Sequence, residues 1–116
     1  MRLAEKLNLR KRMKVRVVGK PAGVDLDDVT TTNSNQADAL LVFVTSLVEV
    51  DAMCGPVVEA AMEDRLAWIA YPKAGQPGTD LNRDILWRHL LKRRIQGVRQ
   101  IAIDDVWSAL RFRREK

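Results

Sequence analysis

An unbroken apolar run from Leu40 to Val44, within the segment ADALLVFV, constrains this chain more than any other feature. Its branched and aromatic side chains leave it no polar face, which is typical of a parallel strand buried on both sides of a sheet. A second run of this kind, LAWIAYP, occupies residues 66–72. Parallel strands need long crossover connections, so the two runs predict an α/β fold.

The segment between these runs has helical spacing, and Ser46 is placed to cap its start. The apolar positions that recur along it are Leu47, Val50, Met53, Val57 and Ala61. Pro56 interrupts the segment, and proline has no backbone N–H to donate. We therefore expect a kink, or one helix that ends and a second that begins with Pro56 in its first turn.

The chain after residue 72 predicts one more helix and two more strands. Thr79 or Asp80 is the expected helix cap, and the helix should end near Gly97. Its apolar face comprises Leu81, Ile85, Leu86, Leu90 and Leu91. The segments VRQIAID and WSALRFR predict short strands, and the tight Asp104–Val106 connection between them favours an antiparallel hairpin.

The first 37 residues are less regular. Residues 2–8 suit a short amphipathic helix, because leucines lie four positions apart. Val15 and Val17 alternate with charged residues, which indicates a strand with one wet face near a sheet edge. Residues 20–37 predict a loop that can include a short edge strand near residues 29–31.

Size and composition agree with one domain over residues 1–116. A chain of 116 residues with 47% hydrophobic and 30% charged residues can bury one core. The element order predicts a two-layer or three-layer, Rossmann-like, mostly parallel sheet of about five strands that ends in an antiparallel hairpin.

Several classes of protein and of site are disfavoured by composition. No run approaches the roughly 20 apolar residues of a membrane span, and no signal-peptide core follows the basic start, so we expect a cytoplasmic protein without a membrane partner. A single cysteine, Cys54, and a single histidine, His89, offer no zinc spacing, so we expect no metal site. Cys54 is expected to pack on a helix and not to act as a nucleophile.

The net charge of +5 is unevenly distributed. Basic residues dominate the first 20 positions and residues 71–100, whereas acidic residues dominate residues 21–70. A basic patch of this kind attracts nucleic acid or an acidic partner. Nucleic-acid binding is nevertheless disfavoured, because aromatic residues make up 5% of the chain and Lys92, Arg93 and Arg94 suit the end of a helix dipole.

The segments ALLVFV and AWIAYP, each followed by a helix, and the closing hairpin resemble the C-terminal part of class I methyltransferases. A closer resemblance is to a bacterial family of unknown function, domain-of-unknown-function family 3052, whose members look like reduced versions of that fold. It is carried by ADALLVFV, WIAYPK, TDLNRDILW and AIDDVWSALRF. The family tends to have a Pro-Gly turn before the first strand, where this chain has Lys11 and Arg12.

The methyltransferase resemblance implies S-adenosylmethionine as a cofactor, held by a glycine-rich turn after the first strand. The corresponding turn here is VVGKPAGVD, in which Gly19 and Gly23 are separated by Lys20 and Pro21. Proline offers no N–H and fixes its own φ, so this turn is a poor cradle for a ligand. The cofactor is therefore disfavoured, although Gly19 stays a candidate ligand-binding residue.

Ligands of parallel α/β sheets bind beyond the carboxyl ends of the strands. The candidate residues at that edge are Gly19, Thr45, Ser46, Lys73, Thr79, Asn82, Asp104, Asp105 and Trp107. In a catalytic site, Lys73 would be a general base or anion holder, and Asp104 or Asp105 would orient it. In the alternative that we favour, Lys73 forms a partly exposed ion pair with an aspartate, and Asp104 shapes the hairpin turn through its side-chain oxygen.

Trp107 shares one face of its strand with Arg111 and Arg113, whereas Ser108, Leu110 and Phe112 share the other. The first face could bind phosphate and stack on a ligand, or its guanidinium groups could pack on the indole. The leading hypothesis is a non-catalytic binding or interaction module. The alternatives are a group-transfer enzyme with its site at Lys73 and, third, a nucleic-acid-binding protein.

The helix count predicts a homodimer. Three helices are too few for both faces of a five-stranded sheet, and the two longer ones lie on the same side in the methyltransferase arrangement. An apolar remainder on the other face would invite a second copy. Size-exclusion chromatography with light scattering should give twice the monomer mass, and a clean monomer at tens of micromolar would contradict the prediction.

Overall fold

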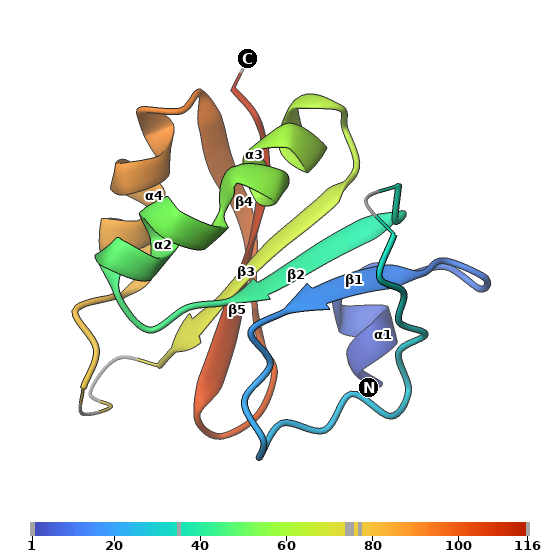
Figure 1. Ribbon diagram of the computed structural model, residues 1–116. Coiled ribbons are helices and arrows are strands. Elements are labelled where there is room, and N and C mark those ends of the chain that lie inside the picture. Colours follow the sequence, from blue (N-terminus) through green and yellow to red (C-terminus); the bar gives the residue numbers. More distant parts are fainter. Residues whose placement is uncertain (1, 35, 74–75, 77, 116) are drawn as a thin grey trace.

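The computed structural model describes residues 2–34, 36–73, 76 and 78–115. Within these ranges the elements are α1 (Leu3–Lys6), β1 (Val15–Val18), β2 (Ala39–Phe43), α2 (Leu47–Met53), α3 (Gly55–Met62), β3 (Leu66–Pro72), α4 (Arg83–Leu91), β4 (Ile95–Ala102) and β5 (Trp107–Arg114). The five strands form one sheet in the order β1-β2-β3-β5-β4 (Figure 1). The predicted α/β class is therefore confirmed.

Parallel pairing joins β1 to β2 and β2 to β3, and antiparallel pairing joins β5 to both β3 and β4. The predicted hairpin is confirmed, and its last strand, β5, lies between β3 and β4. All five residues of β2 are buried, as predicted, because β1 and β3 flank it and side chains cover both faces. The middle of the sheet is β3, which is buried along all of its seven residues.

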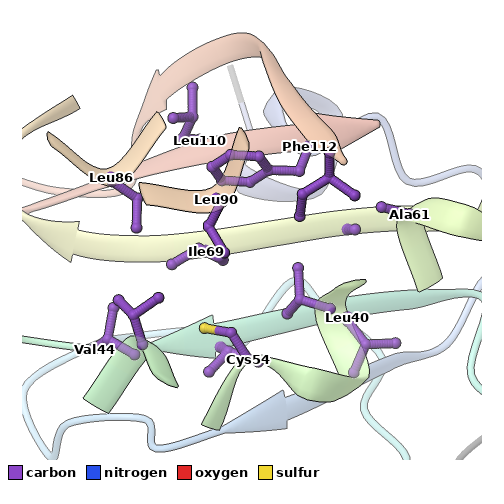
Figure 2. Close-up of a cluster of buried hydrophobic side chains, with 14 of the residues drawn as sticks. Leu40, Val44, Cys54, Ala61, Ile69, Leu86, Leu90, Leu110 and Phe112 are labelled. Carbon is purple, nitrogen blue, oxygen red and sulfur yellow. The ribbon is translucent and has the colours of Figure 1, made fainter. Parts of the chain in front are cut away.

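One face of the sheet is covered by α2, α3 and α4 (Figure 1). The largest apolar cluster forms between these helices and the strands, and Figure 2 shows Ile69, Leu110 and Phe112 of the sheet beside Leu86 and Leu90 of α4. The break at Pro56 is confirmed, because α2 ends at Met53 and α3 starts at Gly55 with proline in its first turn.

The opposite face is covered by α1 and by the connection between β1 and β2. The indole Nε1 of Trp68 donates a hydrogen bond to the carbonyl oxygen of Leu7 (3.1 Å), which fixes the end of α1 against the sheet. From the connection, Val24, Leu26 and Val29 are buried on this face. It is therefore better covered than the helix count suggested. The short edge strand near residues 29–31 is a single parallel bridge between Val15 and Thr31.

The predicted cap of α4 was wrong. Neither Thr79 nor Asp80 caps it; the Asn82 side chain does, accepting a hydrogen bond from Ile85 N at 2.9 Å. The hydroxyl of Thr79 is engaged instead with the backbone of Thr45, at 2.7 Å. All these side chains are good caps, so composition alone could not select among them.

The predicted end of α4 near Gly97 was also wrong. The helix ends at Leu91, and Arg94 has a left-handed φ of 66°, which turns the chain into β4. Gly97 lies within β4, where an added Cβ would come within 3.2 Å of atoms of Trp87 and Leu110. This glycine therefore serves the close approach of α4 to the sheet.

The Trp68→Phe substitution tests how the second face is held. It leaves the Leu7 carbonyl without its indole donor and opens a small void, so the free energy of unfolding should fall by about 1–3 kcal/mol. Urea denaturation measures this loss. Trp107→Phe is the control, because Trp107 is only partly buried and its indole makes no hydrogen bond to a described residue. Equal losses in the two variants would contradict the proposed anchoring role.

Candidate functional site

A cleft of about 550 Å³ opens where α4 begins, over the carboxyl-terminal part of β3 and the neighbouring parts of β4 and β5. We call it the edge cleft. Its lining residues are Tyr71, Lys73, Asn82, Arg83, Asp84, Gln100 and Ser108. Elements that are far apart in sequence thus supply its floor, its wall and its rim.

Strand register creates the floor of the edge cleft. Tyr71 of β3 lies directly opposite Ser108 of β5, so the two side chains project from the same face of the sheet. Gln100 of β4 projects from that face too, and its Nε2 donates a hydrogen bond to Tyr71 Oη at 2.8 Å. Ser108 is 6% exposed, and its hydroxyl has no hydrogen-bond partner among the described residues.

Burial raises the pKa of Tyr71, although the Arg83 guanidinium and the hydrogen bond from Gln100 act in the opposite direction. Desolvation disfavours the charged phenolate, so the phenol keeps its proton at neutral pH. Tyr71 therefore presents an O–H group at the floor of the edge cleft.

The first turn of α4 forms the wall. Asn82 caps the turn by accepting a hydrogen bond from Ile85 N. The backbone N–H groups of Arg83 and Asp84 have no partner within the helix, because they belong to its first two residues. The side chains of Arg83 and Asp84 form an ion pair (3.2 Å) and are 54% and 64% exposed. Solvent screens such a pair, so it stabilises the fold little.

Lys73 stands at the rim, just after β3, and its backbone N–H donates to the Val106 carbonyl at 2.8 Å. Asp104 is used differently, because its Oδ1 accepts hydrogen bonds from Val106 N and Trp107 N, both at 2.8 Å. It thus shapes the hairpin turn. Neither Asp104 nor Asp105 is among the described residues that line the edge cleft with Lys73.

Thr45, Ser46 and Thr79 join the carboxyl end of β2 to the helices. Ser46 caps α2 by accepting from Glu49 N, while the backbone and hydroxyl of Thr45 both donate to the Glu49 carboxylate. These hydrogen bonds, led by the one from the Thr45 hydroxyl, hold the pKa of Glu49 below its usual value. Thr79 donates to the Thr45 carbonyl. The polar groups of these three residues are occupied by the chain itself.

Gly19 and Trp107 lie away from the edge cleft. Gly19 has a φ of 75°, and a Cβ there would come within 2.9 Å of the Phe43 carbonyl oxygen and 3.1 Å of Met53 Cε. A glycine is therefore needed at position 19 because Phe43 and Met53 of the same chain lie so close to it. Trp107 packs edge-on against Phe43 on the opposite face of the sheet, with ring centroids 5.2 Å apart.

Of the candidate residues chosen from the sequence, Lys73 and Asn82 line the edge cleft among the described residues. Five lining residues were missed, namely Tyr71, Arg83, Asp84, Gln100 and Ser108. The strand alternation that placed Ser108 with Leu110 and Phe112 was correct, since the latter two face the helices. The alternation within one strand could not predict the strand register, which puts Ser108 opposite Tyr71.

Two further side chains, those of Cys54 and His89, are not available as a nucleophile or a base in the edge cleft. Cys54 is fully buried, and burial raises the pKa of its thiol to about 12, so its reactive thiolate is disfavoured. His89 of α4 contacts Asp51 of α2 at 2.7 Å, and this hydrogen bond lowers the pKa of Asp51.

Comparison with known proteins found no matching protein-family model and no matching curated protein. In the part of the chain that the structure describes, no helix is long and apolar enough to cross a bilayer. Within the same residues, no cluster of three or more His, Cys, Asp or Glu side chains could hold a metal ion.

Proposed function

We propose that this chain is a non-catalytic binding module on a reduced methyltransferase-like, Rossmann-like α/β fold, and that a small molecule binds in the edge cleft. The observation that carries the proposal is the polar floor within an otherwise apolar face. Further along that face, β3 and β5 present Ala67, Ile69, Leu110 and Phe112 to the helices. At the start of α4 they present Tyr71 and Ser108 instead.

The Ser108 hydroxyl has no hydrogen-bond partner among the described residues, and it lines the edge cleft although the residue is 6% exposed. A hydroxyl held in this way on a strand, beside the O–H group of Tyr71, suits the recognition of a ligand.

The chemistry of the cleft favours binding over catalysis. A serine nucleophile needs an adjacent base, and the one imidazole of the chain, His89, is engaged with Asp51 between α4 and α2. The one thiol, Cys54, is buried and protonated. No described residue that lines the edge cleft is hydrogen-bonded to the Ser108 hydroxyl as a general base would be.

A group-transfer enzyme is the alternative, and the position of Lys73 in the edge cleft favours it. The contacts at Gly19 argue against S-adenosylmethionine in the turn after β1, because the backbone there packs against Phe43 and Met53.

Amide NMR of the ¹⁵N-labelled chain with a library of small polar fragments tests the proposal. Some fragments should shift the amides of Arg83, Gln100 and Ser108, because these residues surround the edge cleft. Ser108→Val should abolish the shifts, since it replaces the free hydroxyl with methyl groups. Ser34→Val is the matched control, because Ser34 is exposed in the loop before β2.

S-adenosylmethionine and its demethylated product complete this panel, and no localised shifts are expected from either. Localised shifts at Gly19, Lys73 and Asp104 would favour the group-transfer alternative. A library without any hit at the edge cleft would contradict the binding function itself.

A further inference from the structure

The floor of the edge cleft offers two O–H groups that can donate hydrogen bonds to a ligand. Gln100 Nε2 donates to Tyr71 Oη, so the phenolic hydrogen must be directed elsewhere. No described residue accepts it. The hydroxyl of Ser108 also has no partner among the described residues. Ser108 lines the cleft although the residue is only 6% exposed.

Of the described residues that line the edge cleft, two of the three charged ones are basic. The Lys73 ammonium stands at the rim, and the Arg83 guanidinium lies near enough to Tyr71 to oppose the rise of its pKa. The first turn of α4 adds the backbone N–H groups of Arg83 and Asp84 at the positive end of the helix dipole. The Asp84 carboxylate opposes an anion and offsets the charge of Arg83, so the described lining residues carry a net charge of one positive unit, that of Lys73.

We propose that the edge cleft binds the phosphate group of a small phosphate monoester, an inference that rests on the proposed binding function. The donors come from three parts of the lining: the floor hydroxyls of β3 and β5, the first turn of α4, and Lys73 after the end of β3. A phosphate monoester has three terminal oxygens to share among three groups of donors, whereas a carboxylate has two coplanar oxygens.

The volume of the edge cleft favours an ester over free phosphate. About 550 Å³ lies within the range of sites for small organic ligands, far more than one phosphate group fills. Because the cleft is open to solvent at Lys73 and Arg83, the organic part can extend over the rim.

Titration of the full ¹⁵N-labelled chain with phenyl phosphate tests this inference. Inorganic phosphate, phenylacetate and phenol are the matched arms. Phenyl phosphate should bind at least tenfold more tightly than phenylacetate and phenol, with amide shifts at Arg83, Asp84 and Ser108. Inorganic phosphate should shift the same amides but bind more weakly, because it lacks the organic part.

Variants assign the contacts. Tyr71→Phe and Ser108→Ala each remove one donor to a charged ligand and should each weaken phenyl phosphate binding about tenfold. Ser34→Ala is the serine control and should leave the affinity unchanged. Lys73→Ala should weaken binding as well, and its position at the rim makes it the safer variant if a floor substitution disturbs folding. Lys11→Ala, at an exposed lysine, controls for the lost charge.

Each outcome decides a different claim. Equal affinity for phenylacetate or phenol would overturn the phosphate assignment and leave the binding function standing. Equal affinity for inorganic phosphate would overturn the ester and leave free phosphate as the ligand. Binding that survives Tyr71→Phe, Ser108→Ala and Lys73→Ala would place the phosphate outside the edge cleft. Failure of the binding function requires, in addition, that no fragment of any class shifts the cleft amides.

Discussion

The hydrogen-bonded ladder between β3 and β5 is the interaction on which the rest of the structure depends. Because β3 is buried along its whole length, it can be flanked only by strands, and β5 satisfies its second edge. The register of this ladder sets Tyr71 opposite Ser108 and aligns Leu110 and Phe112 with the helix-covered core. A slip of one residue would turn every one of these side chains to the other face. Core and cleft are therefore consequences of the same register.

The two faces of the sheet are stabilised by different means. Helices α2, α3 and α4 supply a continuous apolar layer on one face, whereas the other relies on α1, the connection after β1 and the indole hydrogen bond of Trp68 (Figure 1). The edge cleft lies on the first face, at the start of α4. The apolar layer of that face ends there, next to the capped first turn of the helix. The hydroxyls of the cleft are thus held on rigid strands, while the charges of Lys73 and Arg83 sit at a solvated rim. Such an arrangement suits recognition of a charged group by a preformed floor.

Much of this fold could be predicted from the sequence, because its signals are local. The apolar run at Leu40–Val44 predicted a buried parallel strand, and Pro56 marked the helix break. The cap of α4 could not be selected, since Thr79, Asp80 and Asn82 are chemically similar. The edge cleft was mostly missed for a different reason. Lys73 and Asn82 stood out beside loop signals, but Tyr71, Gln100 and Ser108 form a site only through pairing across three strands, which no local pattern encodes.

The central claim is that the floor of the edge cleft holds a buried, protonated phenol, and the chain has a single tyrosine with which to test it. An NMR titration of the Tyr71 ring ζ-carbon against pH gives the pKa of that one group without assignment. Desolvation on the floor predicts a pKa above that of a tyrosine in the unfolded chain, and a return to the ordinary value in denaturant. A native pKa at or below the unfolded value would show that desolvation does not dominate at Tyr71 and would contradict the account.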